Sequence, residues 1–163
     1  MKLFFRQYGQ GFPVIILHGL YGLSDNWVSF GRRLAEDFSV FIQDLRNHGQ
    51  SPHSTVFDFA SMEEDIMEFL DDREFREVVL IGHSMGGKVS MRVALDYPER
   101  VSKLVVVDIG LRRVTGNREH LNLIEVMQSV DFTRVRSRSD VEKQLMPRIP
   151  DQRLRQFLMK NVY

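Results

Sequence analysis

Short runs of apolar, largely β-branched residues recur along the chain up to residue 110. Those at 12–17, 40–45, 78–81 and 104–109 show too little polar alternation for half-exposed strands, and such runs are typical of strands buried on both faces. A weaker candidate at 2–8 is expected at a sheet edge. The pattern therefore predicts a sheet that is covered on both sides.

The segments between these runs place apolar residues at helical spacing. One apolar stripe runs over 27–38 behind Ser24, which is its expected N-cap. Another runs over 62–70 behind Asp58, the expected N-cap of that helix. A third covers 89–97 and ends at a proline. Strands that alternate with helices predict right-handed crossovers and an α/β fold, a mainly parallel sheet with helices on both faces.

The last third of the chain shows only helix-like stretches, at 117–130, 139–146 and 151–162, with Pro147 and Pro150 as breaks before the last. We therefore expect an N-terminal core at 1–112 and an appended helical segment at 113–163. Two roles fit this segment: a cap, or lid, over an active site, and a bundle that merely completes the core.

Composition narrows the functional classes. With 163 residues, 43% of them hydrophobic, the chain has the composition of one ordinary soluble globular domain. Its 22 basic and 22 acidic side chains balance, which gives no electrostatic reason to expect nucleic acid or an anionic membrane as a partner. No signal peptide or membrane-spanning run is visible, so a cytoplasmic location is expected. The chain has no cysteine, so a covalent mechanism needs another nucleophile.

The most informative motif is Gly82-His83-Ser84-Met85-Gly86, which lies between a buried apolar run and a helical pattern. It matches the G-x-S-x-G nucleophile elbow, a tight strand-to-helix turn that lifts a serine hydroxyl above the sheet. The turn requires a strained backbone at Ser84, and a side chain at Gly82 or Gly86 would clash with the neighbouring chain. We expect Ser84 to be the nucleophile; the alternative is a glycine-rich turn with an incidental serine.

A second glycine-bearing loop, 17–22, follows the apolar run at 12–17. Acyl transfer needs two backbone N–H donors for the developing oxyanion, and the natural pair is Leu20 with Met85, the residue after the nucleophile. His18 is expected to fix this loop, and a role as catalytic base is the alternative. The residues expected around the substrate are His18, Gly19, Tyr21 and His83.

Four segments of the chain resemble, in order and spacing, those of α/β-hydrolase-fold serine esterases: HGLYGLSDNW, DLRNHGQSP, GHSMGGK and YPERVSKLVVVDI. The chain looks most like the small YbfF-like acyl esterases, over essentially its whole length. The resemblance implies the α/β-hydrolase fold but does not choose the substrate, because thioesterases, C–C bond hydrolases and perhydrolases carry the same motifs. It also implies that Asp44, Arg46 and His48 stabilise the loop beside the site, with catalytic roles as the alternative. Haloalkane dehalogenases, which use an aspartate nucleophile, are disfavoured by Ser84.

The catalytic acid is expected where the strand predicted at 104–107 ends. The chain order of the triad in this fold is Ser, then Asp or Glu, then His. YbfF-like enzymes carry their acid after the matching strand, which implies Asp108. Many other hydrolases of the fold place the acid one strand later. In that arrangement it would lie beyond residue 163, and Asp108 would be a supporting group or a helix cap.

No residue of the chain meets the expectation for the catalytic base. The only histidine after Asp108 is His120, which lies beside an apolar helix face and is expected to be a satisfied cap or core residue. In the family the base lies on a loop after the last strand. We therefore expect the chain to be the N-terminal portion of a longer hydrolase, with its C-terminal strands absent. The isolated chain should then be inactive and poorly soluble, and its own missing C-terminal segment is the expected protein partner.

The resemblance and the motifs together predict hydrolysis of carboxylic esters with short or medium acyl chains, through an acyl-enzyme on Ser84. Acyl thioesters are the next substrate class. A hydrolase-like protein that binds a ligand without turnover is the alternative from another class. No cofactor and no metal site is expected, because the histidines lack ligand partners at helical spacing and no nucleotide-binding loop occurs.

Overall fold

The computed structural model of the protein describes residues 1–110 and 118–162, except for the side chain of Glu119. The chain divides into two compact units, Met1–Gly110 and Leu111–Tyr163. This division lies close to the boundary expected after residue 112. Neither described range contains a helix that is long and apolar enough to cross a membrane.

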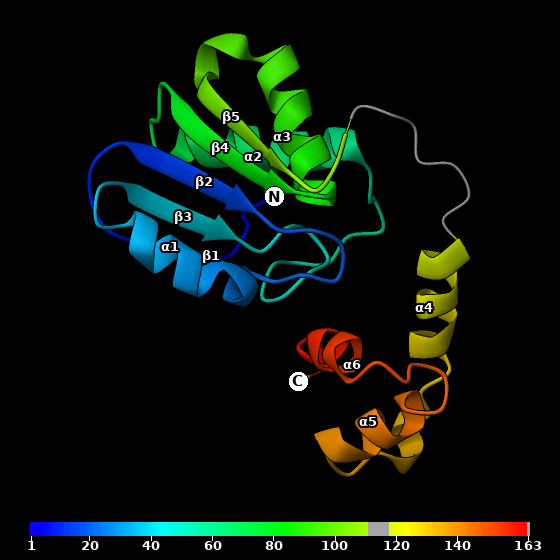
Figure 1. Cartoon of the computed structure of the whole chain (residues 1–163). Coiled ribbons are helices and arrows are strands. Elements are labelled where there is room, and N and C mark those ends of the chain that lie inside the picture. The colour runs from blue at the N-terminus through cyan, green and yellow to red at the C-terminus, as the bar shows by residue number, and fades with distance from the viewer. Residues whose placement is uncertain (111–117, 163) are drawn as a thin grey trace. The chain divides into compact units, whose positions relative to one another are not determined.

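The first unit is built on a sheet of five strands, drawn in Figure 1. The strands are β1 Phe5–Tyr8, β2 Pro13–Leu17, β3 Ser39–Gln43, β4 Val78–His83 and β5 Val101–Val107. Their order in the sheet is β1-β3-β2-β4-β5; β1 runs antiparallel to β3, and all other neighbours are parallel. The mainly parallel sheet predicted from the sequence is confirmed.

The parallel strands end at a common level. Leu17 and Gln43, the last residues of β2 and β3, are paired, and so are His83 and Val107, the last residues of β4 and β5. Leu17 is also paired across to β4. The loops that follow these four strands therefore begin side by side at one edge of the sheet, which is where α/β proteins place their sites.

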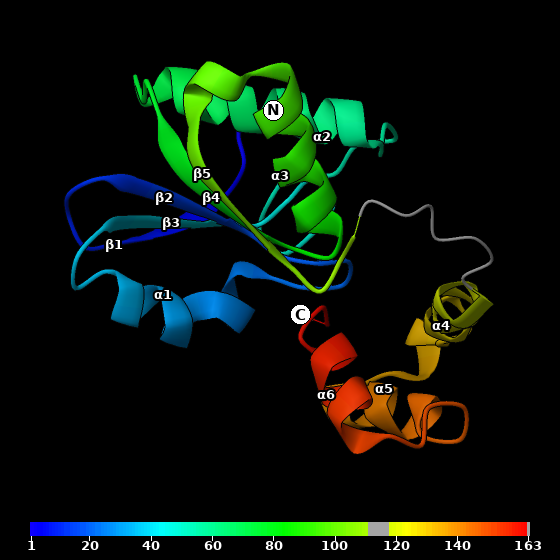
Figure 2. The same ribbon diagram turned by 45° about the horizontal axis from the view of Figure 1, so that its top comes forward.

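Helices cover both faces of this sheet, as Figure 2 shows. The helical elements of the first unit are the 3₁₀ turns η1 Ser24–Trp27 and η2 Pro98–Arg100 and the helices α1 Val28–Leu34, α2 Phe59–Asp72 and α3 Met85–Asp96. Helix α1 packs against one face, and α2 and α3 pack against the other. The sheet is therefore covered on both sides, as its apolar strands predict.

The two predicted N-caps have different outcomes. The Asp58 carboxylate accepts the Ser61 N–H at 2.7 Å and caps α2, as predicted. Ser24 does not cap α1, because it lies inside η1 and its polar groups make tertiary contacts. Its hydroxyl accepts from Arg6 Nε at 3.2 Å, and its N–H donates to Asp44 at 2.6 Å. Tertiary contacts thus override the local capping signal.

The two faces of the sheet carry separate apolar clusters. Ile15 and Leu17 of β2 face α2 and α3, whereas Val14 and Ile16 face α1. These four side chains are at most 2% exposed, so β2 is buried on both faces, as its continuous apolar run predicts. Burial of each such side chain stabilises the fold by about 1.5–3 kcal/mol.

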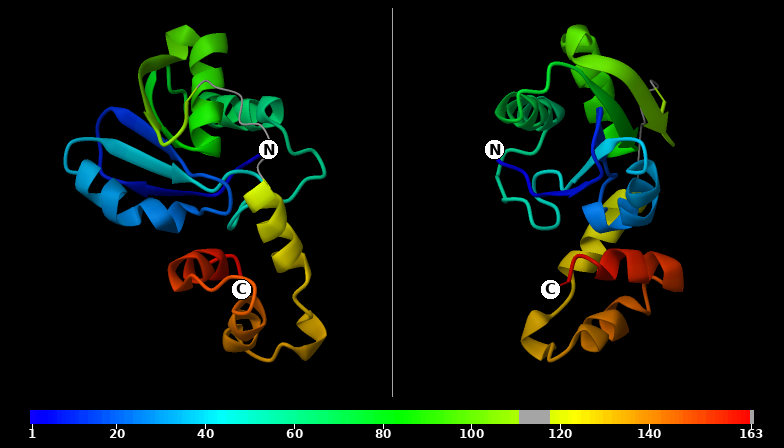
Figure 3. Two further views of the ribbon diagram at one scale, coloured as in Figure 1. Left: turned by 45° about the vertical axis from the view of Figure 1, so that its right-hand side comes forward. Right: turned by 90° about the vertical axis from the view of Figure 1, so that its left-hand side faces the viewer.

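Strand β5 differs from the inner strands because it lies at the border of the sheet, as Figure 3 shows. Each of its residues is at least partly exposed, and the exposed fractions of Leu104 and Val105 reach 38% and 44%. Among the residues that the structure describes, β5 pairs only with β4. Soluble proteins normally cover an apolar strand border of this kind.

The second unit is helical. Its described elements are α4 Arg118–Gln128, the 3₁₀ turn η3 Phe132–Arg134, α5 Arg138–Leu145 and α6 Gln152–Met159. Its buried apolar side chains are Val126, Val141, Leu145, Ile149, Leu158 and Met159. Arg155 is buried beside them and donates to the carbonyl groups of Ile149 and Pro150, both at 2.8 Å. The three predicted helices are present, while Asn117, the predicted start of the first, lies outside the described residues.

Candidate active site

Ser84 lies at the junction of β4 and α3 in a backbone conformation that few residues adopt. Its φ and ψ angles are 48° and −111°, and α3 begins at the next residue. A positive φ strains a residue that carries a Cβ atom, typically by about 1–3 kcal/mol, and such strain concentrates at functional sites. This is the conformation that the sequence predicts for a nucleophile elbow, and it leaves Ser84 half-exposed.

Close approach of the backbone around this elbow requires both of its glycines. A Cβ on Gly86 would lie 2.6 Å from the His18 carbonyl oxygen, and one on Gly82 would lie 2.5 Å from Ser90 Oγ. Both distances are far below van der Waals contact, so neither position accepts a side chain unless the neighbouring chain moves. The clash predicted at these two glycines is confirmed.

Backbone hydrogen bonds hold the elbow against its neighbours. The Ser84 N–H donates to the Val107 carbonyl at 3.0 Å, and the Gly86 N–H donates to the His18 carbonyl at 3.1 Å. The N–H of Met85, between these two, has no acceptor within the described residues. It is therefore free to donate to a ligand.

The loop that follows β2, residues 18–22, contains a tight turn; we call it the β2 loop. The Gly22 N–H donates to the Gly19 carbonyl at 2.9 Å, and Tyr21 has a φ of 63°. The Leu20 N–H lies inside this turn and finds no acceptor in the part of the chain that the structure describes. Leu20 and Met85 thus each present a free backbone donor, and the bond from Gly86 to the β2 loop links the segments that carry them.

His18 is completely buried and uses both ring nitrogens on backbone groups. Its Nδ1–H donates to the Gly19 carbonyl at 2.8 Å, and its Nε2 accepts the Leu45 N–H at 3.0 Å. Burial, followed by the proximity of His48, lowers the pKa of His18 to about 4. A neutral ring with both nitrogens occupied cannot take a proton from Ser84, so the geometry favours the loop-fixing role. The buried ring also offers no surface to a substrate, and only the backbone of His18 can contribute there.

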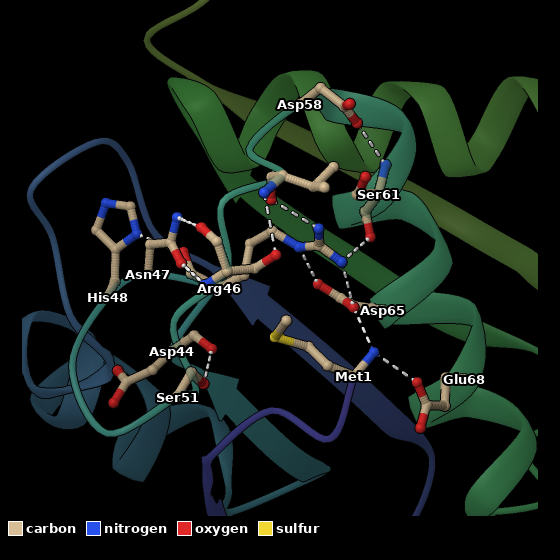
Figure 4. Close-up of polar contacts among 12 residues, drawn as sticks. Met1, Asp44, Arg46, Asn47, His48, Ser51, Asp58, Ser61, Asp65 and Glu68 are labelled. Atoms are coloured by element: carbon tan, nitrogen blue, oxygen red, sulfur yellow. Dashed lines mark hydrogen bonds and ion pairs between the residues drawn. The ribbon is translucent and has the colours of Figure 1, made fainter.

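The loop that follows β3, residues 44–51, is held together by Asp44; we call it the β3 loop. Asp44 is 2% exposed, and its carboxylate accepts the N–H of Ser24 at 2.6 Å and that of Gln50 at 2.9 Å. Its carbonyl accepts the Ser51 hydroxyl at 2.5 Å, a contact drawn in Figure 4. These bonds support the structural role that the resemblance implies for Asp44.

Arg46 joins the β3 loop to α2 (Figure 4). Its guanidinium donates to both Asp65 carboxylate oxygens, at 2.6 and 2.8 Å, and to the carbonyl groups of Val56 and Ser61, each at 2.9 Å. The hydrogen bond to Asp65 raises the pKa of Arg46. The α-ammonium group of Met1 lies 2.6 Å from the same carboxylate. A guanidinium so fully used on protein groups is a structural anchor.

Asp108 directly follows β5 and has a left-handed backbone, with a φ of 56°. Its carboxylate is 85% exposed, and its Oδ2 lies 3.8 Å from His83 Nε2. The His83 ring also lies 6.2 Å from the Trp27 ring, between centroids, and against Gly19 of the β2 loop. The structure thus brings Asp108, His83 and the β2 loop together beside Ser84, and it leaves most of the Asp108 carboxylate open.

The sequence patterns did not indicate two residues that contact the site or its supporting loops: Asp65, which binds Arg46 of the β3 loop, and Trp27, which lies beside His83. Asp65 is 1% exposed on the apolar face of α2, together with Met62 and Ile66. A carboxylate at helical spacing from core residues was the available signal, because such a group is buried only with a partner. Trp27 begins the apolar helical stripe at 27–38, and nothing local in the sequence indicates His83 as its neighbour.

The described residues contain no histidine that is hydrogen-bonded to the Ser84 hydroxyl. His18 is occupied by backbone groups, His83 faces Asp108, and His120 is half-buried on α4 in the second unit. Across residues 1–110 and 118–162, no group of three or more metal-binding side chains occurs either.

Comparison with known proteins identifies the class to which this arrangement belongs. A family model described as the alpha/beta hydrolase fold matches residues 13–140. The chain therefore belongs to the α/β hydrolase family, and the fold predicted from the elbow and its flanking motifs is confirmed.

Several relatives are esterases or lipases. The sn-1-specific diacylglycerol lipase ABHD11 of Danio rerio is 38% identical over 160 aligned residues, covering 94% of this chain and 50% of that protein. Esterase YbfF of Escherichia coli (strain K12) is 30% identical over 149 aligned residues, which cover 91% of this chain and 58% of that protein. A solved structure described as a marine microorganism esterase matches with a TM-score of 0.94 at 41% identity, covering 99% of this chain and 64% of that one. The resemblance to YbfF-like esterases is confirmed, and the chain spans about half the length of the curated relatives it matches.

Proposed function

We propose that this chain carries the nucleophile, the acid and the oxyanion donors of a serine hydrolase that cleaves carboxylic esters. The observation that carries the proposal is the backbone of Ser84, strained at a φ of 48° in a strand-to-helix turn and followed by the free N–H of Met85. A hydroxyl on such a turn reaches a carbonyl carbon, while the adjacent N–H binds the carbonyl oxygen.

The proposed reaction forms and then hydrolyses an acyl-enzyme. Ser84 Oγ bonds to the carbonyl carbon while a histidine base takes its proton, and the N–H groups of Leu20 and Met85 stabilise the negative oxygen. The bond to the alcohol oxygen then breaks, the alcohol receives the proton, and the acyl group stays on Ser84. In the second half, water attacks that acyl carbon and gives a proton to the same base. The bond from the carbon to Ser84 Oγ then breaks, Oγ takes the proton back from the base, and the carboxylic acid is released.

Asp108 is the proposed acid that orients the base, and the base itself is proposed to come from residues outside the 163. The exposed carboxylate of Asp108 has room for such a partner. Within the described residues β5 pairs only with β4, and the exposed border that this leaves supports a further strand pairing beside it. We further propose that 1–112 is the core of the hydrolase and 113–163 its cap, with Gly19, Tyr21 and His83 around the substrate.

The proposed substrates are esters of short or medium acyl chains, with acyl thioesters next. The names of the relatives, among them an esterase and a diacylglycerol lipase, support ester substrates. A series of p-nitrophenyl esters from acetate to palmitate tests the chain length, and we expect the highest kcat/KM between acetate and octanoate. A maximum at palmitate would contradict the proposed length, and a matched thioester that reacts faster than its ester would reverse the order of the two classes.

The central experiment replaces Ser84 by Ala in the natural protein. We expect kcat/KM for p-nitrophenyl butyrate to fall by about 10⁴–10⁶-fold and fluorophosphonate labelling to disappear, with an unchanged circular dichroism spectrum. The matched control is Ser90→Ala on the same helix, because the Ser90 hydroxyl is buried without a hydrogen-bond partner in the described structure. Full activity of Ser84→Ala refutes the assignment.

A second candidate is a hydrolase-like protein that binds esters without turning them over. The observation that favours it is the lack of a histidine on the Ser84 hydroxyl within the described residues. The two candidates separate in the natural protein. Ester binding without Ser84-dependent turnover or labelling supports the binding protein, whereas turnover that Ser84→Ala abolishes supports the enzyme.

A further inference from the structure

Two buried histidines connect the β2 loop and the β3 loop reciprocally. His18 of the β2 loop accepts the N–H of Leu45 in the β3 loop at 3.0 Å. His48 of the β3 loop accepts the N–H of Tyr21 in the β2 loop at 3.3 Å. The two rings lie 5.0 Å apart between centroids, and the residues are 0% and 7% exposed. Each loop therefore supplies the acceptor that holds the other.

A second hydrogen bond fixes the tautomer of each ring. Nδ1 of His18 lies 2.8 Å from the Gly19 carbonyl, and Nδ1 of His48 lies 2.9 Å from the Arg46 carbonyl. A carbonyl oxygen can only accept, so Nδ1 carries the proton; a backbone N–H can only donate, so Nε2 carries none. Both rings are thus neutral and share one tautomer. Burial supports this state, because it lowers the pKa of each.

These bonds act on the two peptide groups that flank Leu20. The Gly19 carbonyl and the Leu20 N–H belong to one planar peptide and point in opposite directions, so holding the carbonyl also aims the N–H. That carbonyl accepts both the His18 ring and the Gly22 N–H. The next peptide, between Leu20 and Tyr21, is held by the bond from Tyr21 to His48.

Backbone strain at Tyr21 favours rotation of the peptide group between Leu20 and Tyr21. Tyr21 has a φ of 63° at the third position of the four-residue turn that Gly22 closes, a position where positive φ favours glycine. Rotation of the Leu20–Tyr21 peptide would relieve that strain. It would also bring the Leu20 carbonyl toward Nε2 of His48, an acceptor against an acceptor. The bond to His48 therefore opposes the rotation.

From this geometry we infer that His48 is a positioning residue for the oxyanion donor at Leu20, acting through the Tyr21 N–H, with His18 as its reciprocal partner. The inference deepens the proposed function and rests on it. It assigns His48 no contact with substrate. Its consequence is that loss of the Nε2 acceptor should slow the chemical step more than it weakens substrate binding.

Three variants of the natural protein test the inference by ester hydrolysis, with kcat expressed per fluorophosphonate-titrated site. His48→Leu removes the acceptor, and we expect kcat to fall by about 10–100-fold with KM within about twofold, since small misplacement of a catalytic group has effects of this size. His48→Gln restores an acceptor oxygen and should recover most of the loss. The matched control is His53→Leu, an exposed histidine just beyond the same loop, which should behave as wild type.

Hydrogen exchange of single backbone amides gives a readout that does not depend on activity. His48→Leu should speed exchange of the Tyr21 N–H by at least about tenfold and leave the Leu45 N–H protected by His18. Equal impairment of the Leu and Gln variants would assign the effect to ring packing and overturn the inference, as would wild-type kcat with slow Tyr21 exchange. If the wild type shows no Ser84-dependent turnover, the proposed function fails, and the exchange experiment still decides whether His48 holds the turn.

Discussion

The candidate site has two sides that are built in different ways. On the side of the β2 and β3 loops, His18 and Asp44 are at most 2% exposed, and every one of their side-chain polar atoms is hydrogen-bonded to backbone. On the side of β5, the Asp108 side chain is 85% exposed, and its Oδ2 lies 3.8 Å from Nε2 of His83. The first side is fixed by contacts within the chain, whereas the second leaves its carboxylate and its strand border open.

Because of this difference, we expect substitutions on the two sides to affect different properties of the protein: its stability on one side and its activity on the other. A buried group that satisfies backbone donors stabilises the fold, and its removal leaves those donors without partners. An exposed carboxylate contributes little to stability, so its value lies in what it can bind. We therefore expect substitutions on the loop side to lower the free energy of unfolding, and substitutions on the β5 side to lower turnover while leaving the fold intact.

The largest expected effect comes from Asp108→Asn. Asparagine tolerates the left-handed φ of 56° and keeps the shape of the side chain, so the free energy of unfolding should change by less than about 0.5 kcal/mol. If Asp108 orients the base, kcat of the natural protein should fall by about 10⁴-fold in p-nitrophenyl ester hydrolysis. The control is Asp37→Asn at an exposed position away from the site. Unchanged kcat would place the acid elsewhere, one strand later in the chain.

The opposite result is expected for Asp44→Asn on the loop side. One oxygen is replaced by an NH₂ group, which then faces a backbone N–H of Ser24 or Gln50, donor against donor. One bond is thus lost at a buried site, and the other loses its charge, so the free energy of unfolding should fall by about 3–5 kcal/mol, measured by urea denaturation. Asp37→Asn again serves as the control. A loss of activity at full stability would contradict the structural assignment of Asp44.

The sequence contained enough to predict the parts of the molecule that depend on local pattern. The run at 12–17 gave a buried strand because only continuous apolar character suits a strand covered on both faces. The strained backbone of Ser84 could be predicted because the elbow requires glycine at two fixed positions around a serine, between a strand and a helix. Asp58 could be predicted as a cap because the backbone N–H that its carboxylate accepts, that of Ser61, is three residues away.

The parts that escaped prediction depend on contacts between distant residues. Ser24 has a good capping side chain, yet its groups are used by Arg6 and Asp44 from two other segments. The reciprocal bonds of His18 and His48 each span 27 residues and exist only because β2 and β3 are neighbours in the sheet. Local patterns of apolar residues do not predict which strands are neighbours in the sheet.

The third prediction concerns the pH dependence of the loop side. His18 has a pKa of about 4 in the folded protein, lowered by burial first and then by His48 and, to a smaller extent, His83, while Gly19 and Asp44 oppose the shift. Its pKa is about 6.5 when unfolded. Between these values the unfolded state binds more protons, so the stability associated with neutral His18 is complete above about pH 6.5 and is lost as pH falls toward 4.

Neutral His18 contributes about 3 kcal/mol to the free energy of unfolding, and this contribution is lost between about pH 6.5 and pH 4. In His18→Asn the amide NH₂ can still donate to the Gly19 carbonyl, but the side chain no longer titrates. We expect the wild type to be more stable at neutral pH and this advantage to shrink by up to the same amount as pH falls to about 4, in urea denaturation at a series of pH values. Parallel stability curves for the two proteins would show that His18 is not the group that titrates.

The smallest expected effect concerns Gln43, a buried side chain directly before the β3 loop whose polar atoms, unlike those of His18 and Asp44, have no hydrogen-bond partner in the described structure. Gln43, the last residue of β3, is 0% exposed, and both polar atoms of its amide lack a hydrogen-bond partner in the described structure. A buried amide without partners costs stability, so Gln43→Met, of similar volume and shape, should raise the free energy of unfolding by about 1–2 kcal/mol at an unchanged urea m-value. Gln7→Met, at an exposed position on the neighbouring strand β1, should change it by less than about 0.5 kcal/mol. A lower free energy of unfolding for Gln43→Met would contradict this prediction. It would indicate that a bound water satisfies the amide in the folded protein.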